Sequence, residues 1–166
     1  VNAAAHLGRH LSAFPGGSLR PLLESSSLFR TLSDRGLRTA HANVAPSTIA
    51  RRRVRTVSAT AIAAESAGLP LRTLDDLEAG QALHHEFTNA SLIAYGCDVT
   101  PVSPEEAGRR LAAIARDADF CAFEYFLTDA AGHDADAVTA RRRIAHLDAF
   151  LDALLAATDL SHSHVV

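Results

Sequence analysis

The sequence predicts an α/β fold in which helices flank a mostly parallel sheet, and two stretches carry most of this prediction. In the first, residues 27–35 have the pattern of a short helix, Gly36 is placed to end it, and residues 37–43 alternate like a strand. In the second, residues 119–127 are nearly continuous in apolar side chains, which is typical of a parallel strand buried on both faces. A helix is predicted to follow at about 136–158, where apolar residues recur every three or four positions.

Between these stretches the pattern is weaker and predicts several short helices. One lies within 58–71, and another has Thr73 as its N-cap and Gly80 as its stop. Short helices between proline and glycine breaks favour an inserted, cap-like segment over residues 45–100. The chain would then divide into an N-terminal part of the α/β core (1–44), this insertion, and a C-terminal part of the core (101–166).

Another helix is predicted after residue 103, because residues 103–106 form the pattern of a helix N-terminus. Ser103 is a good N-cap, Pro104 fits the first helical position, and Glu106 lies where it completes a capping box. Farther along, Asp134 and Asp136 are suited to the positive end of the last predicted helix.

The overall composition excludes some classes of protein. Hydrophobic residues make up 48% of the 166 residues, which is enough for a sizeable core, and the net charge of −3 argues against a protein that binds nucleic acid by neutralising phosphates. The basic run 51–55 is interpreted as a solvated face, with a phosphate-contacting patch as the alternative. Two cysteines are too few for a disulfide framework, and no signal peptide or membrane-length apolar stretch is evident, so we expect a cytoplasmic protein with no membrane partner.

The sequence FEYFLTDAAGHDAD (residues 123–136) contains the candidate metal site. Asp129 and His133 follow the predicted strand 119–127, and we expect them in a loop at the carboxyl edge of the sheet, where ligands collect in open α/β folds. One carboxylate oxygen and one imidazole nitrogen suit Zn²⁺ or Mn²⁺ better than Ca²⁺, and Gly132 would allow a tight turn that aims both at one ion. The alternative is that Thr128 or Asp129 merely caps a helix with His133 in its first turn.

These residues, followed by the IAHLDAFLDALL helix (144–155), resemble the metalloenzyme domain of the alkaline phosphatase superfamily, which includes cofactor-independent phosphoglycerate mutase and phosphopentomutase. The opening VNAAAHLGRHLSAFPG (1–16) resembles the stretch just downstream of the nucleophile in that family. The two matches occur in the family's order and together span most of the chain. The resemblance implies that the sheet is part of an alkaline-phosphatase-like sheet.

The same resemblance implies a phosphatase (a hydrolase) or a phosphomutase (an isomerase) that acts on a small phosphate ester with two divalent ions, Mn or Zn. Asp129 and His133 would hold one ion, and Arg9, His10 and Asn2 would contact the substrate. The Ser or Thr nucleophile and the other metal ligands have no counterpart between Val1 and Val166, so we expect this stretch to be a fragment that alone binds metal weakly and has no turnover.

Other readings stay open at this point. The chain could be an inactive fragment or binding module of the same fold, or part of a sulfatase-like hydrolase. Arg9 could equally be a surface residue. Four other histidines are expected to have no functional role: His84 and His85, with Glu86, as exposed polar residues of the insertion, and His162 and His164 as loop residues.

Overall fold

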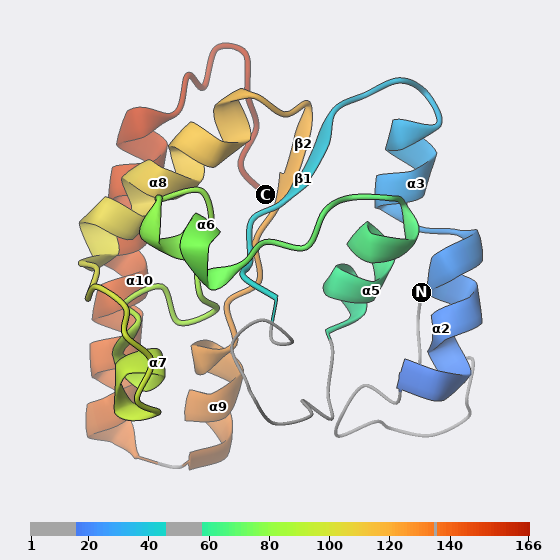
Figure 1. Cartoon of the computed structure of the whole chain (residues 1–166). Helices are drawn as coiled ribbons and strands as arrows, with labels where there is room; N and C mark the ends of the chain where they lie inside the picture. Colours follow the sequence, from blue (N-terminus) through green and yellow to red (C-terminus); the bar gives the residue numbers. More distant parts are fainter. Residues whose placement is uncertain (1–15, 46–57, 135) are drawn as a thin grey trace.

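The computed structural model describes residues 16–45, 58–134 and 136–166, and in these ranges it has a mixed α/β fold that is mostly helical (Figure 1). Two short strands, β1 (Thr39–His41) and β2 (Phe120–Ala122), pair in parallel, with Thr39 opposite Phe120 and His41 opposite Ala122. The predicted α/β class and the parallel pairing are therefore confirmed. The sheet of the described residues is smaller than the sequence pattern suggested.

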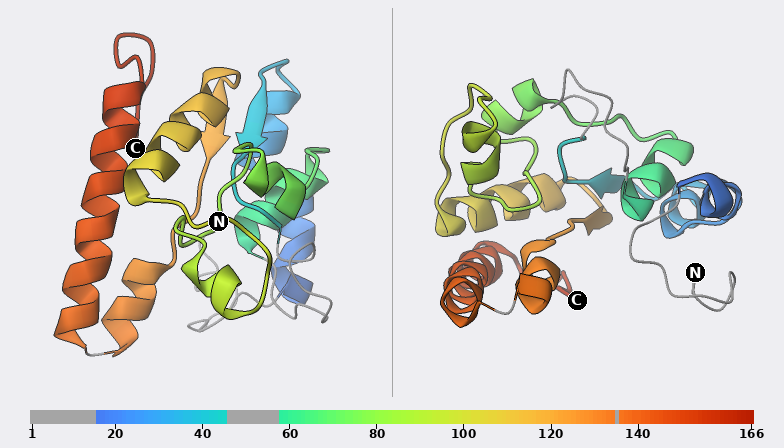
Figure 2. Two further views of the ribbon diagram at one scale, coloured as in Figure 1. Left: turned by 60° about the vertical axis from the view of Figure 1, so that its left-hand side comes forward. Right: turned by 90° about the horizontal axis from the view of Figure 1, so that it is seen from below.

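Helices flank this sheet on two sides, as Figures 1 and 2 show. α2, α3 and α5 lie on one side, and α8 and α10 lie on the other and pack along each other. The helices are α2 (Gly16–Ser25), α3 (Leu28–Ser33), α5 (Ala59–Ser66), α6 (Leu74–Glu78), α7 (Ala90–Ala94), α8 (Pro104–Arg116), α9 (Leu127–Asp134) and α10 (Ala137–Ala157). Within these described ranges, no helix is both long enough and apolar enough to cross a bilayer.

Several helix ends follow directly from the local sequence. Ser27 caps α3 by accepting a hydrogen bond from the Arg30 N–H, and Gly36 behind that helix has a φ of +78°, where a side chain would be strained. Thr73 and Asp76 form a complete capping box at the start of α6. At α10, the Asp136 carboxylate accepts from the Val138 and Thr139 N–H groups, as predicted, whereas Asp134, predicted at the same helix start, is the last residue of α9.

The start of α8 confirms half of the predicted capping box. The Ser103 hydroxyl accepts a hydrogen bond from the Glu106 N–H, and Pro104 occupies the first turn. The Glu106 carboxylate, however, pairs with the side chains of Arg109 and Arg110. Two guanidinium groups on the same helix face are stronger partners for a carboxylate than one backbone N–H at the cap.

The prediction of a long strand over 119–127, buried on both faces, is wrong. The ladder ends at Ala122, and the residues of β2 are only half-buried. Beyond it, the Asn43 side chain replaces a strand partner: its Nδ2 donates to the Glu124 carbonyl at 2.9 Å, and its Oδ1 accepts from the Glu124 N–H at 2.8 Å. This clamp holds the chain in place between the end of β2 and the start of α9.

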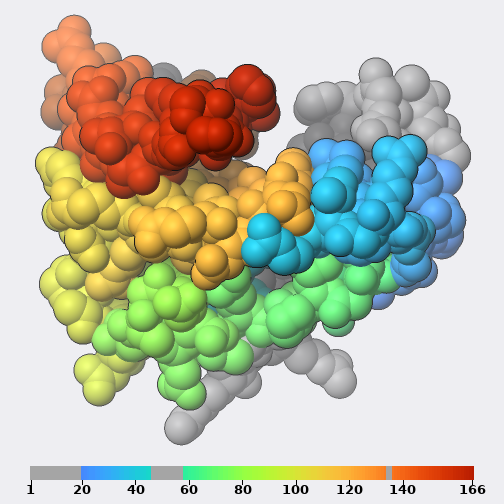
Figure 3. All heavy atoms as spheres, turned by 90° about the horizontal axis from the view of Figure 1, so that it is seen from above, coloured from blue at the N-terminus to red at the C-terminus, as the bar shows by residue number. Residues whose placement is uncertain are grey.

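The largest core cluster lies between the sheet and the α8–α10 pair. At its centre the Phe87 ring stacks on both Tyr125 and Phe150, with ring centroids 5.1 and 4.6 Å apart. Gly108 allows the close approach of the two helices, because a Cβ at this position would lie 2.3 Å from the Phe150 carbonyl oxygen. Figure 3 shows the surfaces of α8 and α10 in direct contact.

Residues 58–100 are attached to the sheet at several points. α5 packs against α2, α3 and β1. The chain also continues past β1 through two isolated parallel bridges, Asn43 with Leu83 and Val44 with Arg72. The bridge at Leu83 matters for the site, since it brings the residues that follow Leu83 to the carboxyl side of the sheet, where β1 and β2 also end.

Candidate metal site

Asp129 and His133 lie on the carboxyl side of β2, as predicted, but in a helix and not in a loop. α9 begins at Leu127, only five residues after β2 ends at Ala122, and both residues lie within it. Gly132 is not a bend: it sits inside α9, and it is absent from the described glycines that have a positive φ. The proposed sharp glycine turn is therefore wrong, and it is the four-residue spacing on a helix that places the two side chains on one face.

The two side chains approach each other. The His133 Nε2 lies 3.7 Å from the Asp129 Oδ1, and the side chains are 80% and 82% exposed. Zn–N and Zn–O bonds of about 2.0–2.2 Å place two ligand atoms roughly 3.4 Å apart in a tetrahedral site, so a small side-chain rotation would bring both onto one ion. The donor types and their separation therefore fit a divalent metal.

The described part of the chain offers no third ligand at this position, and none of its His, Cys, Asp and Glu side chains form a group of three suited to a metal ion. An ion held here by protein atoms would have two ligands from α9, with its other positions open to water, to a substrate oxygen or to ligands from elsewhere. Two exposed ligands alone bind a divalent ion weakly.

The other predicted site residues cannot be placed relative to α9. Arg9, His10 and Asn2 lie outside the described residues, as does the basic run 51–55. Their assignment to substrate phosphate remains a prediction from the sequence.

A second histidine-rich element was missed by the sequence reasoning. His84 and Glu86, expected on the surface, are only 6% and 7% exposed, and the prediction is wrong for both. Leu83 pairs with the extension of β1, which carries the next residues into the interior, and Phe87 anchors them in the core. The signal in the sequence was the flanking pair of apolar residues, Leu83 and Phe87, around the polar triplet. We call residues 84–89 the histidine turn.

Burial sets the charge state of the histidine turn. Burial first, and the neighbouring His84 second, lower the pKa of His85 to about 4, so its ring is neutral at pH 7. Burial opposes ionisation of Glu86, but the His84 ring and the hydrogen bonds from the Ser91 N–H and the Thr88 hydroxyl outweigh it and keep its pKa below the usual value. The turn thus holds a neutral His85 ring beside a buried carboxylate.

Burial likewise lowers the pKa of His41 on β1, against the opposing effect of Glu124. Its Nε2 is buried and has no hydrogen-bond partner in the described residues. The carboxyl side of the sheet therefore carries buried imidazoles at His41 and in the histidine turn, whereas the exposed imidazole of His133 lies on α9.

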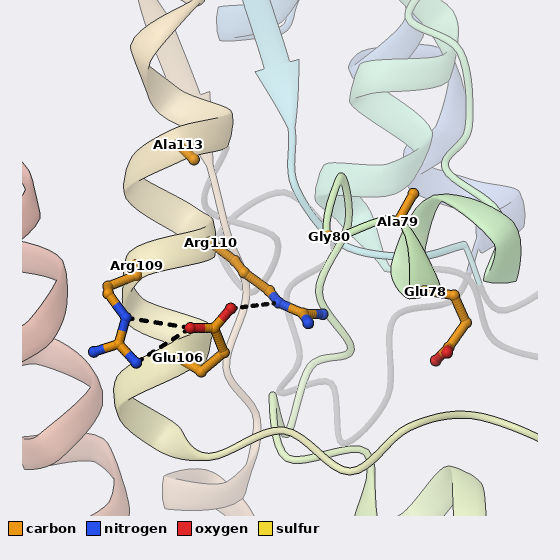
Figure 4. Close-up of a pocket in the computed structure, with 7 residues that line it drawn as sticks. All are labelled: Glu78, Ala79, Gly80, Glu106, Arg109, Arg110 and Ala113. Carbon is orange, nitrogen blue, oxygen red and sulfur yellow. Dashed lines mark hydrogen bonds and ion pairs between the residues drawn. The ribbon is translucent and has the colours of Figure 1, made fainter.

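Two other polar groups are weaker candidates for a site. A shallow pocket of about 320 Å³ lies between α6 and α8 (Figure 4). Its Glu106 is paired with Arg109 and Arg110, and its Glu78 carboxylate accepts two hydrogen bonds from Thr100, so these groups are already engaged.

At the C-terminal end, His162 lies 3.0 Å from Asp159, and Ser161 also bonds to this carboxylate. This is a local cap in which the oxygens of Asp159 are occupied, and it places His162 in an exposed turn, as expected for a loop residue.

Comparison with known proteins gives no relative: no family model matches the chain, and neither the curated proteins nor the solved structures contain a significant match. The likeness to the alkaline phosphatase superfamily therefore remains a prediction from the two sequence motifs.

Proposed function

We propose that this chain is part of a metal-dependent phosphoryl-transfer enzyme, a phosphatase or phosphomutase that acts on a small phosphate ester. The observation that carries the proposal is the Asp129–His133 pair, held 3.7 Å apart on one face of α9, just past the carboxyl end of a parallel strand. The alkaline-phosphatase-like sheet, the two Mn or Zn ions and the Ser or Thr nucleophile outside this chain belong to the same proposal.

In this enzyme Asp129 would provide a carboxylate oxygen and His133 its Nε2 to one of the ions. Divalent ions, when bound, can activate a hydroxyl nucleophile and neutralise charge on a phosphoryl group. The chain's own contribution is access and spacing: both side chains are more than three-quarters exposed, so a phosphate ester could reach an ion held between them. The free thiols of Cys97 and Cys121 fit a reducing cytoplasmic setting for this activity.

Calorimetric titration of the chain with Mn²⁺ or Zn²⁺ tests the site directly. We expect one weak binding event, and in His133→Ala an affinity at least about tenfold lower, since one of two ligands is lost. His162→Ala is the matched control, because it removes an equally exposed imidazole that lies beside a carboxylate already bonded to Ser161. Identical isotherms for the wild type and His133→Ala would remove the metal assignment.

A binding module of the same fold without catalytic activity is the second candidate. It is favoured by the presence of only two suitable donors at the α9 site in the described ranges. Assays of the complete protein with phosphate and sulfate esters separate the candidates. Turnover of phosphate esters supports the proposed enzyme, turnover of sulfate esters alone indicates a sulfatase-like hydrolase, and metal binding without turnover of either indicates a binding module.

A further inference from the structure

The histidine turn combines two features that are costly for a folded protein. The first is a set of buried polar atoms without hydrogen-bond partners in the described residues: the Nδ1 atoms of His84 and His85 and the Oδ1 of Asn89. Buried polar groups are nearly always hydrogen-bonded, so three such atoms within six residues of sequence are unusual.

The second feature is backbone strain. Phe87 and Asn89 have φ values of 47° and 64°, and in the described ranges they are the residues other than glycine with a positive φ. Asparagine tolerates this conformation, but a bulky aromatic residue does so only when its surroundings force it. Strain of this kind gathers at sites that bind a ligand or change conformation.

Specific contacts keep the turn closed despite these costs. The Phe87 ring is held between Tyr125 and Phe150, and the Asn89 Nδ2 donates to the Thr100 carbonyl at 2.8 Å. The Glu86 Oε1 accepts from the Ser91 N–H at 3.2 Å. Packing and these hydrogen bonds therefore stabilise the closed turn, and the polar atoms without hydrogen-bond partners destabilise it. A change of charge can shift the equilibrium between the closed and open forms.

We propose that the histidine turn is a proton-operated switch: it is closed over the aromatic core while at most one of its two imidazoles is charged, and it opens when both are. The ring centroids of His84 and His85 are 4.1 Å apart, and the His84 Nδ1 lies 3.8 Å from the Glu86 Oε1. The buried carboxylate of the turn thus already faces His84. With the His84 ring charged, a proton on His85 would put two positive rings in contact, and the described residues offer no second carboxylate to pair with them.

The groups around His85 support this assignment. Among the described residues, the titratable groups that act on its charge are His84, which disfavours it, and Glu86, which favours it less strongly, and its other ring neighbour is the uncharged Phe126. Tyr125 faces Glu86 from the segment after β2. On opening, the His85 imidazole leaves the burial that lowers its pKa and can accept a proton from water, and Phe87 leaves its stack. The inference concerns a site apart from α9 and does not depend on metal binding.

Amide hydrogen exchange of the whole chain between pH 7 and pH 4.5, expressed as protection factors, tests the switch. The Phe87 N–H bonds to the His84 carbonyl and the Thr88 N–H to the Glu86 carbonyl, so these amides report on the turn, while Leu111 in α8 reports on the core. We expect opening at Phe87 and Thr88 to increase up to about tenfold per pH unit below pH 6.5, with a much smaller change at Leu111.

The variant His85→Gln keeps a polar side chain that cannot gain a proton, and it should abolish this pH dependence, whereas the control His162→Gln should retain it. Protection that does not change with pH in the wild type, an equal change at Leu111, or an unaltered slope in His85→Gln would each overturn the proposal. If His85→Gln fails to fold, the ¹⁵N chemical shifts of the wild-type imidazoles decide: a neutral His85 ring at pH 5 supports the switch, and a charged ring within the closed turn refutes it.

Discussion

The helix α9 and the histidine turn both place histidine and a carboxylate on the carboxyl side of the sheet, but in opposite environments. Asp129 and His133 are more than three-quarters exposed and spaced by a helix, whereas His84 and Glu86 are less than one-tenth exposed and held by a strained turn. Exposed donors are free to bind an ion from solvent. In the histidine turn, burial lowers the pKa of the neighbouring His85 and so disfavours its charged form.

The comparison shows that residue types alone do not define a site. The sequences DAAGH and HHE both bring histidine close to a carboxylate, and burial separates their chemistry. Desolvation disfavours the charged form of an imidazole and also excludes a hydrated cation, so we propose a metal site only for the exposed pair and a pH response only for the buried turn. The predictions below test this contrast, beginning with the largest expected effect.

Removal of the ring that anchors the turn should have the largest effect. Phe87 is 1% exposed and stacks on two aromatic rings, so Phe87→Ala should lower the free energy of unfolding by about 3–5 kcal/mol. Chemical denaturation followed by circular dichroism measures this change. The control Tyr95→Ala removes an aromatic ring that is 85% exposed and should change stability by no more than about 0.5 kcal/mol. Comparable losses in both variants would contradict the core position of Phe87.

Two helical glycines should respond in opposite ways to the same substitution. Gly108→Ala places a methyl group 2.3 Å from the Phe150 carbonyl oxygen and should destabilise the fold by about 1–3 kcal/mol. Gly132→Ala meets no atom within 4 Å and should stabilise α9 by about 0.5–1 kcal/mol. Thermal unfolding of the two variants provides the measurement. A marked loss of stability in Gly132→Ala would contradict the helix at this position and support the predicted glycine bend.

The buried His41 should make stability depend on pH in a definite direction. Burial lowers its pKa in the folded state, so its contribution is fully present above the unfolded value of 6.5 and decreases as the pH falls below 6.5. The free energy of unfolding should therefore decrease less in His41→Gln than in the wild type between pH 7 and pH 5. Denaturant titration at each pH measures this difference. An equal acid loss in both proteins would show that His41 takes up its proton in the folded state as readily as in the unfolded chain.

Local chemistry explains what the sequence predicted well. The caps at Thr73, Ser103 and Asp136 and the stop at Gly36 depend on neighbours within a few residues, so these helix ends could be read from the sequence. Parallel pairing also followed from the order of helices and strands.

Long-range contacts explain what could not be predicted. β2 is short because Asn43, 81 residues away in the chain, takes over the hydrogen bonds of Glu124. The burial of His84 depends in the same way on the pairing of Leu83 with Asn43. At the site, the Asp129–His133 spacing was visible, but a four-residue spacing fits both a loop and a helix, and only the fold distinguishes them.

The most direct test of the contrast is paramagnetic line broadening in ¹H–¹⁵N spectra of the whole chain, with a small amount of Mn²⁺ added at pH 7. The account predicts that broadening centres on residues 129–133 of α9, while the amides of the histidine turn and those around Asp159 and His162 broaden much less. Broadening centred on the histidine turn or on the C-terminal turn, or none at α9, would contradict the assignment of the exposed pair as the metal site.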